Sequence, residues 1–189
     1  VLCLVGSEMC IRDSAYTIKN NLYLAHSLDS AEAITKHVDP NFVAGQSIHR
    51  NEFGIKNGIF WSNNGKIVAF YEKDETDVHD YPLLDINQTP GSLKSVKYPM
   101  AGQNSEYGKV GVYNTKSKTL IYLQLIHEKD DYVTNLTWSP DDHFIYIAEL
   151  NRDQNHMKWA QYDVNTGKRI KTIFEEKNDK WVEPEYPLY

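Results

Sequence analysis

Glu52 is the residue of this chain whose surroundings best fit a binding role. It lies in a short polar run, after Arg50 and Asn51 and before Phe53. The apolar stretch 59–61 follows closely and has the character of a buried strand. A carboxylate on a polar loop at the mouth of a rigid strand is a common way for a β-scaffold to present a binding group. Glu52 is therefore a candidate ligand-binding residue, although the local pattern alone favours an ordinary surface carboxylate.

Other residue types that support catalysis or metal binding lack the required spacing. The sequence contains no Gly-x-Ser-x-Gly, and Ser105 is flanked by glycines at the wrong distances for a nucleophile. The seven histidines are scattered, with no i, i+4 pair on an expected helix. Acidic pairs at 130–131, 141–142 and 175–176 fall at expected turns or strand ends, where solvated carboxylates are common. We expect no catalytic residue, no metal site and no cofactor in this chain.

Length and composition indicate one globular domain. The chain has 189 residues, of which 41% are hydrophobic and 24% charged. A formal net charge of −6 argues against nucleic acid or an anionic membrane as the main partner. No apolar run approaches the roughly 18 residues that a transmembrane helix needs. Both cysteines, Cys3 and Cys10, lie at the start of the chain, so no disulfide is available to the rest.

The first fourteen residues differ in character from the rest. Residues 4–14 resemble the conceptual translation of a sequencing adapter, and an ordinary disordered N-terminus is the alternative. We exclude residues 1–14 from fold reasoning and expect the domain to occupy 15–189. The adapter interpretation implies that the chain is a fragment whose true start, with any export signal, is missing.

From residue 16 onward the pattern is that of β-structure. A long irregular excursion is expected at 73–108, where six prolines and glycines accumulate. Apolar and β-branched runs between turn residues predict strands at 22–25, 33–36, 59–62, 67–71, 109–113, 119–123, 136–139, 144–148, 158–163 and 169–174.

The strands repeat in groups of four. Trp61-Ser62 and Trp138-Ser139 are 77 residues apart, and each pair is followed by a turn and an apolar strand. Four antiparallel strands, repeated, are the unit of a β-propeller blade. The sequence predicts an all-β fold, a partial β-propeller with about two complete four-stranded antiparallel blades. The last two strands of another blade precede them, and residues 181–184 are the candidate start of a further one. Because propellers close with about 4–8 blades, this chain cannot close a ring alone.

Several stretches in order carry a resemblance to a known family. From about residue 16 to 189, the chain resembles the N-terminal propeller of bacterial dipeptidyl peptidase IV enzymes, which belong to the prolyl oligopeptidase group of serine peptidases. Trp-Ser-Pro-Asp is found in many propellers, whereas Tyr-Pro-x-Ala-Gly and Arg-x-Gln-Asn in this order are more specific. The matching stretches are His49–Ile55, Phe60–Ser62, Lys97–Gly102, Trp138–Asp141 and Leu150–Asn155.

The resemblance implies a role for the polar run. In the family, two adjacent glutamates of the propeller bind the free α-amine of a peptide, which directs cleavage two residues in, usually after Pro or Ala. An ungapped alignment places Glu52 on the second glutamate and Asn51 on the first, with Arg50 as a neighbouring helper. An ammonium group removed from water needs carboxylates to compensate it. Since Asn51 carries no charge, we expect weaker amine binding and less strict dipeptidyl specificity.

The resemblance also implies partners and a location. The catalytic Ser, Asp and His belong to a C-terminal α/β-hydrolase domain that this chain lacks, so the fragment itself should be inactive. The parent protein is expected to be periplasmic, cell-envelope-bound or secreted, and residues 73–108 are the candidate extension for a homodimer. Two alternatives remain: a non-catalytic propeller that binds peptides or proteins, and a tripeptidyl or other exopeptidase relative.

Overall fold

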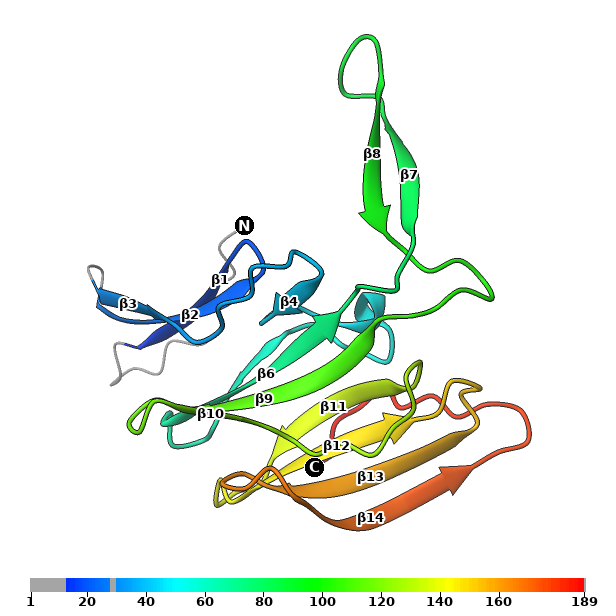
Figure 1. Ribbon diagram of the computed structural model, residues 1–189. Coiled ribbons are helices and arrows are strands. Elements are labelled where there is room, and N and C mark those ends of the chain that lie inside the picture. Colours follow the sequence, from blue (N-terminus) through cyan, green and yellow to red (C-terminus); the bar gives the residue numbers. More distant parts are fainter. Residues whose placement is uncertain (1–12, 28–29, 189) are drawn as a thin grey trace.

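The computed structural model describes residues 13–27 and 30–188, and in these ranges the fold is all-β apart from one short 3-10 turn. Three antiparallel sheets stack side by side, and a separate hairpin projects from them (Figure 1). This is the partial propeller that the sequence predicts. Predictions that concern residues 1–12 lie outside the described ranges; Ser14 is already in the first strand.

Each of the three stacked sheets corresponds to one blade. The first sheet has the order β1 (Ser14–Ile18), β2 (Asn21–Ser27), β3 (Ser30–Ala33). In the second, β10 (Thr119–Tyr122), β9 (Tyr107–Asn114) and β6 (Ile67–Asp74) are followed by β4 (Phe42–Ala44) and β5 (Ile59–Trp61), which both pair with β6. The third has the order β11 (Tyr132–Trp138), β12 (Phe144–Leu150), β13 (His156–Asp163), β14 (Arg169–Lys177).

The hydrophobic cores lie between neighbouring sheets. Strand β6 is apolar on both faces because it is covered on both sides. Its Val68 and Phe70 pack toward the first sheet, whereas Ala69 and Tyr71 pack toward the third. Side chains of a strand alternate between its two faces, so one continuous apolar run supplies both cores.

The 77-residue repeat is present in the hydrogen bonds of two turns. Ser62 donates its N–H to the Ile67 carbonyl at 2.9 Å, and its Oγ accepts the Ile67 N–H at 3.0 Å. Ser139 makes the same two bonds with Phe144, both at 2.9 Å. The turns are therefore equivalent, which confirms the predicted repeat of strand, turn and strand.

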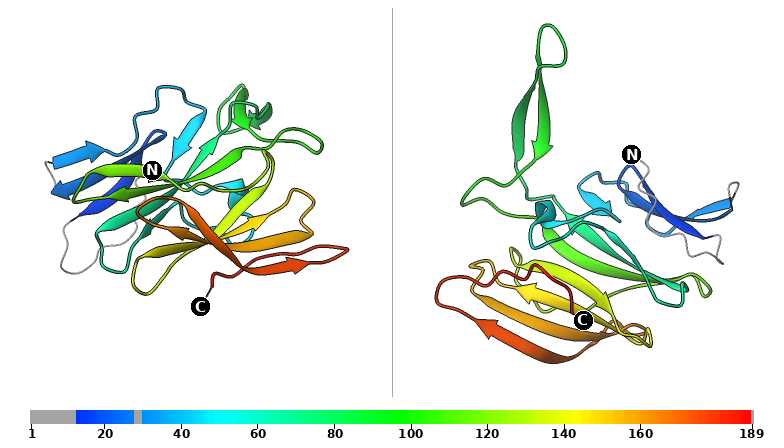
Figure 2. Two further views of the ribbon diagram at one scale, coloured as in Figure 1. Left: turned by 60° about the horizontal axis from the view of Figure 1, so that its bottom comes forward. Right: turned by 180° about the vertical axis from the view of Figure 1, so that it is seen from behind.

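The expectation of a long irregular excursion at 73–108 is wrong. Strands β7 (Asp80–Asp85) and β8 (Ser92–Lys97) form a regular two-stranded hairpin inside this segment. It points away from the three stacked sheets (Figure 1, and the right view of Figure 2). The sequence pattern failed here because the hairpin has no buried face and because Pro82 argues against a strand.

Three smaller differences concern the ends of the chain. The strand expected at 33–36 lies earlier, at Ser30–Ala33, and β1 adds a strand to the first sheet that the sequence did not predict. Residues 181–184 form no strand. Instead Val182 is buried against the third sheet, and its N–H donates to the Gln154 carbonyl at 2.7 Å.

Candidate functional site

The candidate residues lie on a loop inserted into the innermost strand of the second sheet. Strands β4 and β5 pair with the same edge of β6, and residues 45–58 leave the sheet between them. The base of this insertion loop is closed by Tyr71, whose carbonyl accepts the Gly45 N–H at 2.8 Å and whose N–H donates to the Gly58 carbonyl at 2.9 Å. A Cβ on Gly58 would lie 2.2 Å from the Gln46 backbone, so glycine permits the close approach of the two ends.

The third sheet shows where this insertion occurs in the repeat. Its inner strand, β11, is continuous but changes register between Thr134 and Thr137. Asn135, within this bulge, has a φ of +55°. The bulge of one blade thus occupies the position of the inserted loop in the other, and bulges are known to aim side chains beside functional sites.

The insertion loop turns sharply at η1 (His49–Asn51) and exposes three consecutive polar residues. Arg50 and Asn51 have φ values of +54° and +65°. Glu52 has extended backbone angles (φ −63°, ψ 165°), and its N–H donates to the His49 carbonyl at 3.0 Å. All three predicted site residues, Arg50, Asn51 and Glu52, are exposed. The structure therefore brings them together at the tip of one ordered loop.

The Glu52 carboxylate is available for a ligand. Over residues 13–27 and 30–188, the structure records no ion pair to Glu52. The Arg50 guanidinium lies 5.8 Å from the centre of the Tyr98 ring and stacks over it. Tyr98 comes from the Tyr-Pro-Met-Ala-Gly stretch that follows β8, so this second motif meets the insertion loop at its rim.

Buried His49 anchors one end of the exposed tip. Its Nε2 accepts the Val133 N–H at 3.0 Å, which requires a neutral ring with the proton on Nδ1. Burial, with a further contribution from the Arg50 charge, lowers the pKa of His49 from 6.5 to about 3. The main-chain N–H of His49 donates to the buried Glu106 carboxylate, which precedes β9. His49 therefore links the second sheet to the third.

Phe53 anchors the other end of the tip. It is buried, and its ring meets the Tyr132 ring edge-on at 4.9 Å between centroids. Its carbonyl accepts from the Thr134 hydroxyl at 3.4 Å. His49 also meets Tyr132 edge-on, at 5.2 Å. Both anchors thus dock on β11, and the three exposed residues between them are held in place.

A cavity of about 650 Å³ borders the insertion loop. Its lining is mixed: apolar and aromatic side chains of the loop and of both inner strands lie beside the polar Lys56, Asn135 and Glu185. Its walls include Ile55, Phe60, Tyr71, Leu136 and Tyr186. This combination of an apolar wall beside a polar loop suits a ligand that carries both a charge and side chains.

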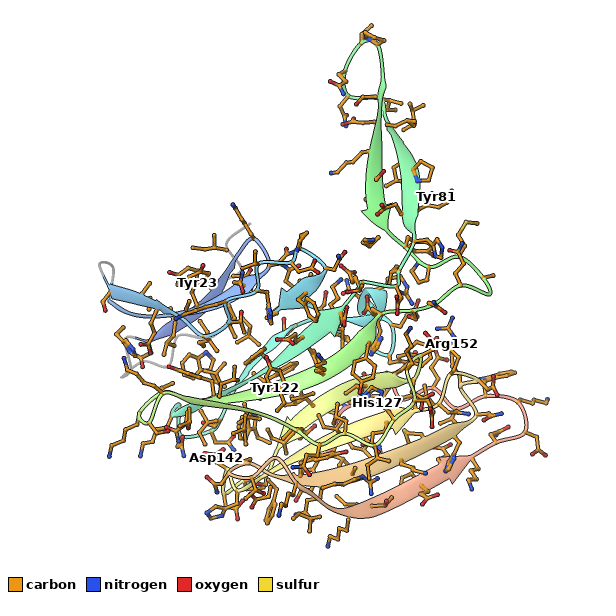
Figure 3. The ribbon with its side chains drawn as sticks, viewed as in Figure 1. Tyr23, Tyr81, Tyr122, His127, Asp142 and Arg152 are labelled. Atoms are coloured by element: carbon orange, nitrogen blue, oxygen red, sulfur yellow. The ribbon has the colours of Figure 1, made fainter. Side chains whose placement is uncertain are left out.

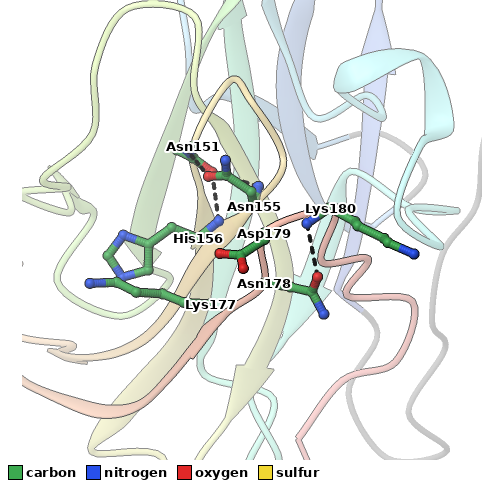
Figure 4. A pocket seen from close by; sticks show the side chains of 7 residues that line it. All are labelled: Asn151, Asn155, His156, Lys177, Asn178, Asp179 and Lys180. Atoms are coloured by element: carbon green, nitrogen blue, oxygen red, sulfur yellow. Dashed lines mark hydrogen bonds between the residues drawn. The ribbon is translucent and has the colours of Figure 1, made fainter.

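A second, more polar cavity of about 820 Å³ is lined by Asn151, Asn155, His156 and residues 177–180 (Figure 4). Here the Asn151 Oδ1 accepts the N–H groups of Asn155 and His156 at 3.0 and 2.8 Å. Its amide thus holds the turn that carries the Arg-x-Gln-Asn stretch, which indicates a structural role. Among the described residues there is no cluster of acidic, His or Cys side chains that could hold a metal ion.

Sequence reasoning missed the buried polar residues around the site. His49 and Glu106 carry no signal that separates them from surface residues of the same type. The acidic pair at 141–142 was expected to be solvated, but Asp142 is only 7% exposed. Its carboxylate accepts the N–H groups of Asn63 and Asn64 at 2.8 and 2.9 Å and joins the equivalent turns of the two blades. Figure 3 shows it at the end of the third sheet opposite to Arg152.

Fold and site together define a propeller segment whose second sheet carries an insertion loop with an exposed polar tip. The profile of the dipeptidyl peptidase IV N-terminal region matches residues 10–188. The chain therefore belongs to the dipeptidyl peptidase IV family and forms part of its N-terminal region.

Solved structures agree with this assignment. A Bacteroides ovatus structure assigned as a dipeptidyl aminopeptidase IV is 43% identical, with a TM-score of 0.86 over 97% of this chain and 26% of that one. Porphyromonas gingivalis dipeptidyl peptidase 4 is 22% identical, with a TM-score of 0.82 over 92% of this chain and 25% of that one, and it shows the shared fold.

Curated relatives are more distant. A Pyrenophora tritici-repentis protein assigned as dipeptidyl-aminopeptidase B is 24% identical over 83% of this chain. The chain spans about a fifth of the length of that relative.

None of the described helical segments is long and apolar enough to cross a membrane.

Proposed function

We propose that this chain is the amine-recognising part of the propeller in a serine exopeptidase that releases N-terminal dipeptides of the Xaa-Pro and Xaa-Ala type. Glu52 binds the free α-amine of the peptide, and Asn51 and Arg50 complete the rim. The observation that carries the proposal is the insertion loop itself. Within residues 45–58 Glu52 is the one acidic residue, and it stands exposed between two buried anchors.

The chemistry follows from charge and neighbours. An ammonium group that leaves water needs a carboxylate partner, and Glu52 has no competing ion pair among the described residues. Asn51 can accept a hydrogen bond but adds no charge. Arg50 is stacked over Tyr98. The cavity beside the loop, with Phe60, Tyr71 and Leu136 among its walls, offers apolar surface to the side chains of the first peptide residues.

Hydrolysis itself is supplied by a C-terminal α/β-hydrolase domain of the same polypeptide, which takes the bound peptide from the propeller side. The export expected from the family resemblance stays a prediction. A non-catalytic peptide-binding propeller is the competing function. The coding sequence beyond Tyr189 separates the two, because the peptidase requires Gly-x-Ser-x-Gly followed by Asp and His.

The test is Glu52→Ala in the full-length protein. A charge-assisted hydrogen bond contributes about 1.5–3 kcal/mol, so kcat/KM on an Xaa-Pro reporter should fall roughly 10–100-fold, mainly through KM. Glu176→Ala, an exposed glutamate on β14, is the control and should change nothing. Asn51→Glu should lower KM by restoring a second carboxylate. An unchanged kcat/KM in Glu52→Ala would show that Glu52 does not bind the peptide amine.

The β7–β8 hairpin is the second element to which we assign a function, namely contact with a second copy of this protein. Leu84, Ile86 and Leu93 are 65%, 79% and 75% exposed. An isolated two-stranded hairpin is marginally stable in water, and clustered exposed apolar side chains commonly mark an interface. A homodimer in which the hairpin packs on the partner subunit supplies the missing contacts.

A further inference from the structure

The position of Glu52 is fixed through the main chain of His49. The Glu52 N–H donates to the His49 carbonyl at 3.0 Å, and the His49 N–H donates to the Glu106 carboxylate. The other side of His49 is held by Val133 of β11, whose N–H meets Nε2 at 3.0 Å. A displacement of His49 therefore reaches Glu52 through one hydrogen bond and three peptide units.

The surrounding backbone needs such a support. His49, Arg50, Asn51 and Phe53 all have positive φ, between +50° and +65°. These conformations are unfavourable for residues with a Cβ and persist only where neighbouring contacts impose them. The contacts that do so at the start of the tip come from His49 and Glu106, which are 0% and 3% exposed.

We propose that His49 and Glu106 are positioning residues for the amine site: they hold Glu52 in place by bridging the second and third sheets and do not touch the peptide. This inference rests on the proposed role of Glu52. Lys73, at the end of β6, lies 3.7 Å from Glu106 and offsets the buried negative charge on the second sheet. The bridge thus makes the geometry of the site depend on how two blades are packed.

The side chains of His49 and Glu106 are close but not hydrogen-bonded to each other in this structure. The Nδ1 of His49 lies 3.6 Å from Oε1 of Glu106, which is beyond a hydrogen bond, and this buried nitrogen has no partner in the described part of the chain. A shift of a few tenths of an ångström completes the bond. Hydrogen bonds at binding sites are often long without substrate and tighten in the complex.

Gly108 provides a second, independent way to disturb the bridge. It lies on β9 opposite the imidazole, and a Cβ at this position would lie 3.2 Å from Nε2 and 3.4 Å from Cε1 of His49. Gly108→Ala removes no hydrogen-bonding group, and its nearest contact is the ring; the Ile48 side chain, at 3.4 Å, is the other neighbour. The neighbour must move by a few tenths of an ångström, which displaces the main chain that carries Glu52.

The experiment uses the full-length protein and an Xaa-Pro reporter with a free amine. His49→Ala is expected to raise KM roughly tenfold with kcat changed less than about twofold. His49→Gln, whose amide oxygen can accept the Val133 N–H, should restore KM to within about threefold of wild type. Gly108→Ala should raise KM in the same direction, and His143→Ala, an exposed histidine in another turn, should leave it unchanged.

A double variant decides whether the effect passes through Glu52. If His49 acts by positioning Glu52, His49→Ala combined with Glu52→Ala has the KM of Glu52→Ala alone, because the effects are not additive. Additive effects, or a fall in kcat that matches the change in kcat/KM, overturn positioning. Glu106→Gln and Gly108→Ala decide the matter if His49→Ala does not fold.

The two proposals fail in different ways. If Glu52→Ala raises KM strongly while His49→Ala and Gly108→Ala do not, amine recognition stands and the positioning inference is wrong. If Glu52→Ala has no effect, the proposed function is wrong and this inference falls with it.

Discussion

At the scale of single residues, buried polar side chains decide how the blades meet. Asp142 accepts hydrogen bonds from the main-chain N–H groups of Asn63 and Asn64 and from the Asn63 side chain. It sits at φ +59°, where the equivalent turn of the other blade has Gly65 at +65°. The Asp142 carboxylate therefore joins the two blades, whereas a glycine could adopt the same backbone conformation.

Asp142→Gly isolates this carboxylate because glycine adopts the same backbone without strain. The variant leaves the Asn63 and Asn64 donors without their partner, so we expect a loss of about 2–4 kcal/mol in the free energy of unfolding. Urea unfolding of the full-length protein measures it. Asp153→Gly, at an exposed turn position, is the matched control for the change in chain entropy. Equal stability losses in both variants would show that Asp142 does not join the blades.

His49 makes stability depend on pH. Its pKa is about 3 in the folded protein against 6.5 for a free histidine. Between these two pKa values the unfolded chain binds a proton at His49 and the folded chain does not. The stabilisation present above pH 6.5 is therefore lost as pH falls toward 3, at up to about 1.4 kcal/mol per pH unit. His49→Gln should flatten the stability curve between pH 6 and 4 by that slope. His143→Gln should not, since the neighbouring Asp141 raises the pKa of that exposed ring, the opposite direction to His49.

At the scale of elements, the sequence predicted the parts whose residues face a core. Strands β6 and β12 were found because both faces are apolar, and the turns at Ser62 and Ser139 because their residues repeat. The repeat extends to Glu72 and Glu149, which are both buried and lie 77 residues apart. Each accepts a hydrogen bond from a tyrosine, but from different strands of the blade: Tyr122 of β10 at 2.7 Å and Tyr162 of β13.

The candidate site was only partly predictable for a physical reason. The exposed tip at residues 50–52 can be read because polar residues interrupt an apolar pattern. The buried residues that hold this tip, His49 and Glu106, cannot be predicted from the sequence. Glu106 lies 57 residues from His49 and becomes its partner only when β9 pairs with β6. The hairpin β7–β8 was missed for the opposite reason: it buries no face, so it leaves no periodic pattern.

At the scale of the whole molecule, the sheets stack so that the insertion loop and the hairpin emerge at the same end of β6 (Figure 1). Tyr98 connects the two. Its ring meets Tyr81 of β7 edge-on at 5.9 Å, and the Arg50 guanidinium stacks on it at 5.8 Å. The dimer contact that we propose for the hairpin would therefore also affect the rim of the proposed amine site.

Replacing residues 80–97 with a short Gly-Ser linker tests this arrangement. Because β7 and β8 pair only with each other among the described strands, the blades should keep their stability, with a Tm within about 2 °C of the parent. Sedimentation velocity should show the full-length protein change from dimer to monomer.

Leu84→Ser with Leu93→Ser should weaken the dimer while keeping the hairpin, which separates loss of the apolar contact from loss of the strands. A monomeric parent, or a linker variant that stays dimeric, contradicts the proposal. In the linker variant KM should also rise, since Tyr98 loses its contact with Tyr81 and no longer holds Arg50 at the rim.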